Sequence, residues 1–309
     1  MKQFPLGFIG FSEAVSNMGR GLRNEGFKDI LAYDVALNKE GPYRDTVLKR
    51  CDDAKVTAVF SSKELVENSS VVIIAVPARF TASMAEGLLP FVKTGSPERR
   101  SLFVDITTAM PDIKAKLADE FAKRGADYID SAILGPMMTL GHRVPILASG
   151  RGSKRWRDLM TPFNMKIVLV NPRDPDSTSV GEASRIRLVR SVFMKGIGAL
   201  VAETMLFARK CGIENYILDS IAGSMDRGSF RDIALRMAGT DLVHSERRSF
   251  EVGESMELMK AVGVDPIVAA AVKERLDRTA ALAVNEELHG VIPGKFEMIY
   301  DLWEKKRYK

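Results

Sequence analysis

Residues 181–212 form the stretch that most restricts how this 309-residue chain can fold. The stretch contains no proline, and its two internal glycines, Gly196 and Gly198, lie among strong helix formers. At the rise of an α-helix it predicts a helix of more than roughly 40 Å, longer than most helices of globular proteins. Apolar side chains occur on nearly every side, so we expect this helix to be buried on several sides.

One narrow stripe of the predicted helix is polar. At 100° per residue, Ser184, Arg187, Ser191 and Lys195 fall within one sector of the helical wheel. A buried helix does not carry two cations on one stripe without partners, because unpaired buried charge is costly. Two interpretations follow: the stripe is a solvated edge of the helix, or it lines a cleft that holds an anionic ligand.

The composition is that of an ordinary soluble protein, with 46% hydrophobic and 28% charged residues. Cys51 and Cys211 provide neither a disulfide framework nor the spacing of a metal site, so we expect a reducing cytoplasm and no metal. The net charge of +5 is mild, and no basic face is interleaved with aromatic residues, which argues against nucleic-acid binding. No apolar run reaches the length of a membrane span, so we expect no membrane partner.

Residues 1–178 alternate short apolar runs with helical patterns, which is typical of a parallel sheet with crossover helices. The expected strands cover residues 6–9, 30–33, 71–76, 102–104, 128–130, 144–148 and 167–170. The proline-rich and aspartate-rich loop at residues 171–176 marks the best domain boundary. The pattern of the remaining sequence predicts a series of helices and no strands.

A glycine-containing turn follows the first expected strand. A dinucleotide site needs a tight turn there, a close approach of the backbone to the pyrophosphate, and a helix N-terminus directed at the phosphates. Gly10 supplies the turn, whereas Ser12 and Val15 replace the usual second and third glycines. The position of the turn between strand and helix still favours a dinucleotide site. The residues predicted to contact the cofactor here are Gly10, Phe11, Ser12, Glu13 and Ala14.

Asp34 ends the second expected strand. A carboxylate at this place accepts hydrogen bonds from ribose hydroxyls and repels a 2′-phosphate, which favours NAD over NADP. The alternative is an ordinary turn aspartate. We therefore predict an α/β fold with a Rossmann-type, doubly wound parallel sheet in residues 1–178. An all-α domain follows in residues 179–309.

Four segments, taken in order, resemble the β-hydroxyacid dehydrogenase family, the relatives of 3-hydroxyisobutyrate and 6-phosphogluconate dehydrogenases. They are residues 7–10, residues 105–108 with Pro111, residues 130–135 with Gly150, and the long helix from Gly181. Within the family the chain resembles a branch whose turn reads Gly-Phe-Gly-Glu-Ala and whose long helix carries a Lys-Gly pair, here Lys195-Gly196.

The resemblance implies a site at the carboxyl ends of the strands. It places Val76, Pro77 and Ala78 beside the nicotinamide end of the cofactor, and Thr107 and Thr108 where the family meets substrate and cofactor. Leu134, Gly135 and Pro136 replace a Ser-Gly-Gly loop that grips the substrate carboxylate. Proline has no backbone N–H, so only Leu134 and Gly135 are left as donors, and the carboxylate is held differently or is absent.

The long helix departs from the family at its most important position. Counted from Gly181, the catalytic lysine of the family corresponds to Arg187, and an asparagine one turn later corresponds to Ser191. Arginine does not exchange its proton usefully, but it polarises a carbonyl or clamps an anion. Three interpretations remain open: Arg187 acts electrostatically while water supplies the proton; Lys195, roughly 12 Å further along the helix, is the proton donor; or the redox activity is degraded.

A second departure lies in the helical domain. We expect a helix that begins near residues 241–248 and stops at Gly263. The lysine that faces the active site in the related dehydrogenases is missing from it. We expect Arg247 to replace it in substrate binding, with His244 beside it, and a solvated surface cluster is the alternative.

The resemblance implies a nicotinamide-dependent oxidoreductase whose all-α domain, residues 179–309, serves substrate binding and dimerisation. Hydride would pass between NAD, or NADP, and a small hydroxy acid, oxo acid or sugar-acid relative, with Arg187 and Thr107 stabilising charge on the substrate oxygen. The alternatives are an imine reductase on the same fold and a cofactor-binding protein with little catalysis. We expect a small anionic substrate and a homodimer, the latter also because the long helix is apolar nearly all round.

Overall fold

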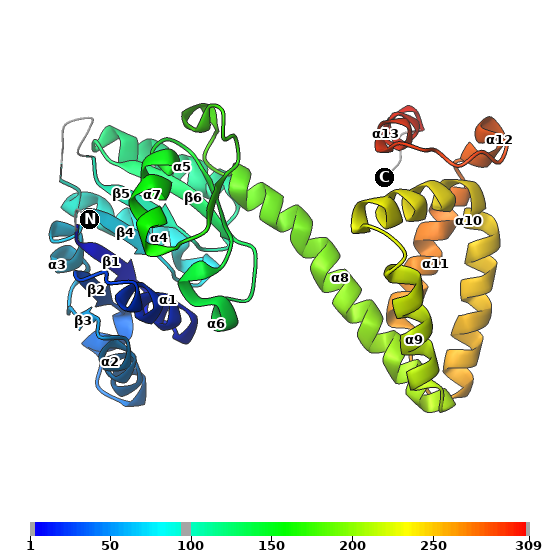
Figure 1. Ribbon diagram of the computed structural model, residues 1–309, viewed down its shortest axis with the longest axis horizontal. Coiled ribbons are helices and arrows are strands. Elements are labelled where there is room, and N and C mark those ends of the chain that lie inside the picture. The colour runs from blue at the N-terminus through cyan, green and yellow to red at the C-terminus, as the bar shows by residue number, and fades with distance from the viewer. Residues whose placement is uncertain (1–3, 94–99, 307–309) are drawn as a thin grey trace. The chain divides into compact units, whose positions relative to one another are not determined.

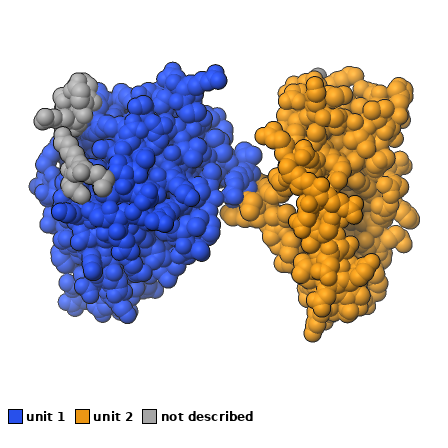
Figure 2. All heavy atoms as spheres, in the orientation of Figure 1, with its two compact units in different colours: residues 1–191 blue, residues 192–309 orange. Residues whose placement is uncertain are grey.

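The computed structural model describes residues 4–93 and 100–306 and divides into two compact units, residues 1–191 and 192–309 (Figure 2). The first unit contains an eight-stranded sheet, and the described part of the second is built from helices (Figure 1). This confirms the predicted α/β class with a helical C-terminal region. The first unit extends past residue 178 to Ser191, because the first turn of the long helix packs into it with Ala183 and Ser184 buried.

The sheet has the strand order β3-β2-β1-β4-β5-β6-β7-β8. Its strands are β1 (Leu6–Ile9), β2 (Ile30–Tyr33), β3 (Thr57–Ala58), β4 (Val71–Ile74), β5 (Leu102–Asp105), β6 (Asp127–Ile133), β7 (Ile146–Ser149) and β8 (Ile167–Leu169). All neighbours pair in parallel except β6 and β7, which are antiparallel. The two-residue strand β3 was not expected, because so short a pairing leaves no periodic pattern.

Both faces of the sheet are covered by helices. The first unit contains α1 (Glu13–Asn24), α2 (Pro42–Ala54), α3 (Ser62–Glu67), α4 (Thr81–Leu88), α5 (Pro111–Lys123), α6 (Met137–Leu140) and α7 (Ser153–Met160). Its 3₁₀ turns are η1 (Val35–Asn38), η2 (Ala78–Phe80), η3 (Leu89–Phe91), η5 (Gly141–Arg143), η6 (Thr161–Phe163) and η7 (Pro175–Ser177). One core joins the sheet to α1, α2 and α7, and a second joins it to α3, α4 and α5. Strands β1, β4 and β5 are consequently buried along their whole length, as their continuous apolar runs predict.

The strand order reverses between β1 and β4. From β1 the chain moves outward through β2 to β3, and it then returns to β4 on the other side of β1. In open parallel sheets, ligands bind outside the carboxyl ends of the strands at such a switch point. The residues that follow β1, β2 and β4 therefore lie where a ligand site is expected.

The long helix α8 (Glu182–Cys211) has the predicted length but not the predicted burial. Its apolar side chains are largely exposed, and Val189 and Val192 expose 71% and 77% of their surface. By length and composition α8 could cross a membrane, which corrects the expectation that no segment reaches that length. That expectation is wrong because Lys195 and Glu203 interrupt the apolar run of α8, while its other charged residues lie near the two ends of the helix.

The helices after α8 have a small core of their own. They are α9 (Glu214–Met225), α10 (Phe230–Ala261), α11 (Ile267–Ala280), α12 (Val284–Leu288) and α13 (Phe296–Lys305). Leu242, Val284 and Ile299 form the buried cluster of this unit. Helix α10 begins well before residue 241, which corrects the expected start, because the Ser229 hydroxyl caps the helix by accepting a hydrogen bond from the Asp232 amide at 3.2 Å.

Candidate dinucleotide site and the Arg187 cluster

A cavity of about 750 Å³ opens at the carboxyl ends of β1, β2 and β4. It lies at the switch point of the sheet, and residues of the first unit alone line it. Six of the predicted cofactor contacts line this cavity: Gly10, Phe11, Ser12, Asp34, Val76 and Pro77. Glu13, Ala14 and Ala78 are their neighbours in the chain and are not among the lining residues.

Gly10 is required by its backbone conformation and by its surroundings. Its φ of +87° lies in the left-handed region, which disfavours side chains with a Cβ atom. A Cβ added here would lie 2.5 Å from the carbonyl oxygen of Ala75, at the end of β4. The turn thus brings bare backbone to the cavity wall, as close approach to a pyrophosphate requires.

Asp34 ties two parts of the cavity wall together. One of its carboxylate oxygens accepts a hydrogen bond from the Phe11 amide at 2.9 Å, and the other accepts one from the Ala36 amide at 3.0 Å. A carboxylate has about four lone-pair sites, so two acceptor sites remain for ribose hydroxyls. The same side chain therefore shapes the glycine turn and remains able to bind a ribose.

Ser12 is the N-cap residue of α1 and is exposed. Its hydroxyl makes no capping hydrogen bond, so it is free to donate to a phosphate at the helix N-terminus. Val15 occupies the position of the third glycine and is 2% exposed, since it packs into the core beside α1. The replaced glycines are thus accommodated without closing the cavity.

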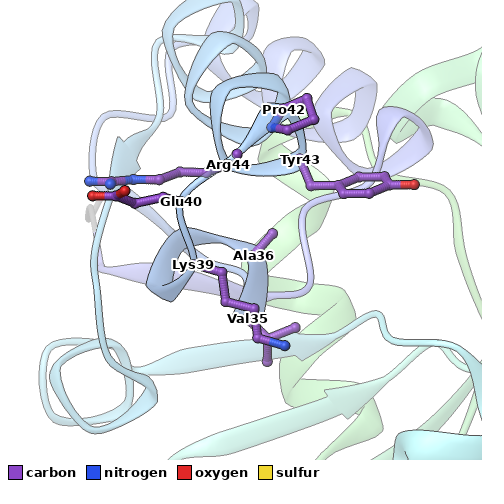
Figure 3. A pocket seen from close by; sticks show the side chains of 8 residues that line it. Val35, Ala36, Lys39, Glu40, Pro42, Tyr43 and Arg44 are labelled. Atoms are coloured by element: carbon purple, nitrogen blue, oxygen red, sulfur yellow. The ribbon is translucent and has the colours of Figure 1, made fainter.

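Several lining residues were not predicted. Tyr43, Thr46 and Arg50 come from α2, and Ser83 and Met84 come from α4. A smaller recess of about 280 Å³ shares Val35, Ala36 and Tyr43 with the main cavity and is also lined by Lys39 and Arg44 (Figure 3). No sequence motif predicts these contacts, because they depend on which face of α2 or α4 points toward the carboxyl ends of the strands.

Thr107 and Arg187 are brought into contact. A guanidinium nitrogen of the half-buried Arg187 donates to the Thr107 carbonyl oxygen at 3.4 Å. The Thr107 hydroxyl is buried, where it accepts hydrogen bonds from the Thr81 hydroxyl at 2.9 Å and the Ala109 amide at 3.3 Å. Thr108, by contrast, is exposed.

The electrostatic environment of Arg187 comes from buried carboxylates. Burial lowers the pKa of its guanidinium, and Asp130 and Asp105 act in the opposite direction. An arginine nevertheless remains protonated at working pH, so Arg187 supplies a fixed positive charge. Part of the polar stripe on α8 therefore has partners inside the first unit. Neither a solvated edge nor a bound anion is needed to explain why Arg187 is there.

The other predicted substrate contacts have different surroundings. Ser191 is partly exposed, and Lys195 is exposed, with no ion-pair partner among the described residues. The Leu134 amide donates to the Pro145 carbonyl at 2.9 Å, which leaves the Gly135 amide as the donor of that loop. Arg247 lies in the middle of α10, where it is exposed and pairs with Glu251.

Comparison with known proteins places these features in context. Residues 5–160 match the family model described as the NAD binding domain of 6-phosphogluconate dehydrogenase. Residues 208–279 match a domain of unknown function (DUF1932). An uncharacterized 28.5 kDa protein of Methanothermus fervidus is 24% identical over 268 residues, which cover 87% of this chain and 96% of that protein.

The mitochondrial 3-hydroxyisobutyrate dehydrogenase of Mus musculus is 32% identical over 135 residues, which cover 42% of this chain and 36% of the mouse enzyme. A solved structure of a reductive aminase from Aspergillus terreus, in complex with NADPH and ethyl levulinate, has the same fold. The TM-score is 0.71 at 14% identity, and the match covers 98% of this chain and 99% of that chain.

Proposed function

Because the chain belongs to the β-hydroxyacid dehydrogenase family, we propose that it is an NAD(P)-dependent oxidoreductase that acts on a CH–OH group or, in reverse, on a carbonyl. The observation that carries the proposal is the cavity at the switch point of the sheet, with Gly10 on its wall and the Asp34 carboxylate at the end of β2. Bound NAD(P) supplies or accepts the hydride. We propose NAD as the preferred form, since Asp34 repels a 2′-phosphate.

The role proposed for Arg187 is electrostatic. As the substrate oxygen gains negative charge, a preorganised guanidinium stabilises that charge more than water does. The exposed Thr108 is the hydroxyl that meets the substrate, whereas Thr107 holds Arg187 through its carbonyl oxygen. Water supplies the proton, because arginine does not release its own. Lys195 is the alternative donor.

Reduction of a C=N bond is the second candidate. Arg187 replaces the catalytic lysine of the family, and the Leu134 amide is engaged by Pro145. Without the lysine, no side chain at this position protonates a substrate oxygen. With the Leu134 amide engaged, the loop has one donor fewer for a substrate carboxylate. An imine needs neither, and the reductive aminase that shares the fold was solved in complex with NADPH and ethyl levulinate.

The test is the oxidation of NADH and NADPH by the purified protein with two panels of substrates. One panel contains β-oxo acids of increasing length, and the other contains cyclic imines. Turnover of an oxo acid supports the dehydrogenase proposal, and turnover of imines alone supports the second candidate. Tight binding of either cofactor without turnover of any compound would contradict both and favour a binding protein.

A further inference from the structure

Lys114 is the most completely buried cation described in the first unit, and no sequence motif marks it. It lies on α5 with 0% of its side chain exposed. Its ammonium group donates to the Asp130 carboxylate at 2.9 Å and to the carbonyl oxygens of Thr107 and Asp105 at 3.0 and 3.2 Å. Three acceptors match its three protons, so Lys114 is not free to act on a substrate.

Asp130, on β6, joins Lys114 to the first turn of α8. One carboxylate oxygen accepts hydrogen bonds from Lys114 and from the Ser184 hydroxyl at 2.6 Å. The other accepts one from the Ser184 amide at 2.8 Å and one from the Ser149 hydroxyl at 3.3 Å. Because Ser184 and Arg187 are three residues apart, they lie on the same face of the helix. The carboxylate thus fixes the turn from which Arg187 projects.

Lys114 and Arg187 meet at one atom, the Thr107 carbonyl oxygen, which accepts hydrogen bonds from both. The Thr107 amide in turn donates to the Asp105 carboxylate at 2.7 Å. The loop after β5 is therefore held from both sides. Its conformation and the position of Arg187 depend on the same buried network.

The charges of the network balance. Two buried carboxylates, Asp105 and Asp130, face two cations, Lys114 and Arg187. Without Lys114, both carboxylates would compete for Arg187, because a buried charge without a partner is strongly unfavourable. Arg187 would then be drawn toward the sheet and away from the substrate.

We propose that Lys114 and Asp130 are positioning residues that hold Arg187 and the loop after β5 in the arrangement needed for catalysis. The role of Arg187 itself rests on the proposed function. The positioning does not, because it concerns how the first turn of α8 is attached to the sheet. Two separate readouts therefore test the two claims.

The first readout is hydrogen exchange of residues 182–190 and 105–110 in the full-length protein. Lys114→Met and Asp130→Asn should each speed exchange in both segments by about tenfold or more, because buried hydrogen bonds are lost. Exchange of β1 should not change. Lys123→Met is the matched control, because Lys123 lies on the same helix and is exposed, with Glu120 as its partner.

The second readout is kinetic and uses whichever panel compound the wild type turns over. Both variants should lower kcat by about 10², while the dissociation constant of NADH stays within about twofold. The double variant should lose less than the product of the two single losses, because the partners act as a pair. Ser184→Ala, which leaves every charge in place, should show a smaller loss and guards against misfolding of the charge variants.

Unchanged exchange in segments 182–190 and 105–110 would overturn the proposal, even if the variants were inactive. Independent losses that multiply, or equal losses of NADH affinity and kcat, would also overturn it, since a general structural role predicts them. If the wild type turns over no compound, the proposed function fails. The exchange measurement then still decides whether the network positions Arg187.

Discussion

The two units of this chain bury their apolar side chains very differently. In the first unit the strands β1, β4 and β5 are buried at every position, between two layers of helices. In the second, Leu242, Val284 and Ile299 form a small core. Most of the large apolar side chains that are exposed among the described residues lie in this second unit.

The first unit contains every residue that lines the cavity, whereas the second leaves apolar surface uncovered. The cavity assigned to the cofactor needs residues of the first unit alone. Large apolar side chains are exposed along α8 and α9, and apolar patches of this kind mark interaction sites. We propose that a second copy of the chain covers it, with a lipid bilayer against α8 as the rival occupant.

The largest loss is expected when Gly10 is replaced. Such a loss of NADH affinity would show that the glycine turn of the first unit binds the cofactor. Gly10→Ala combines a strained φ with a clash against the Ala75 carbonyl. NADH affinity, measured by calorimetry, should fall by about 10² to 10³. Gly26→Ala is the control, since Gly26 has the same φ of +87° with no atom within 4 Å of the added Cβ. Equal losses in both variants would mean that strain in the fold, not the cavity wall, is responsible.

Arg187 lies at the end of the first unit, and its removal should have the next largest effect. Arg187→Ala should lower kcat by about 10², the loss typical of a preorganised donor to developing charge. Arg187→Lys should retain part of the activity and gain a pH dependence, because lysine can titrate. Lys195→Ala should lower kcat far less than Arg187→Ala does. A greater loss for Lys195→Ala would transfer the proton-donor role to Lys195.

A charged side chain introduced on α8 tests whether a second copy of the chain covers the apolar surface of the second unit. Val192→Glu should weaken self-association by about tenfold or more, because it places an unpaired charge in an apolar interface. Val168→Glu, on the exposed position of β8, should have no effect. Sedimentation velocity gives the readout. A stable wild-type monomer at micromolar concentration would refute the dimer, and retention by phosphatidylcholine vesicles would favour the bilayer.

The smallest effect is expected when the residues that select between NAD and NADP are changed. Asp34→Asn combined with Val35→Arg removes a carboxylate and adds a guanidinium beside the shared recess. The preference for NAD over NADP should fall by about tenfold, since one charge-assisted hydrogen bond is lost. Dissociation constants for both cofactors check this. Wild-type protein that binds NADP at least as tightly as NAD would contradict the role given to Asp34.

The sequence predicted the sheet well because buried parallel strands leave continuous apolar runs, such as Val71–Ile74. It also predicted that Gly10 and Asp34 lie at strand ends, and both line the cavity there. It failed for Lys114, because an isolated lysine in a helical pattern looks like a surface residue until the fold places two carboxylates around it.

The burial of α8 was mispredicted for a related reason. An apolar pattern shows that a helix surface avoids water, but it does not show whether the cover comes from the same chain. The expected start of α10 is wrong because the charged residues 241–248 resemble a helix start, whereas Ser229 and Asp232 form the cap of the helix. Local signals predicted most elements, but not their exact bounds and not the contacts between them.

The most direct test of the central claim is transfer of deuterium from NADH that carries deuterium at both hydrogen positions of nicotinamide C4. The purified protein is incubated with the oxo-acid and imine panels, and each product is analysed by mass spectrometry. An oxidoreductase places one deuterium on the reduced carbon of at least one product, and Arg187→Ala reduces the rate by about 10². NADH that binds in the Gly10 cavity without delivering deuterium to any product would contradict the account.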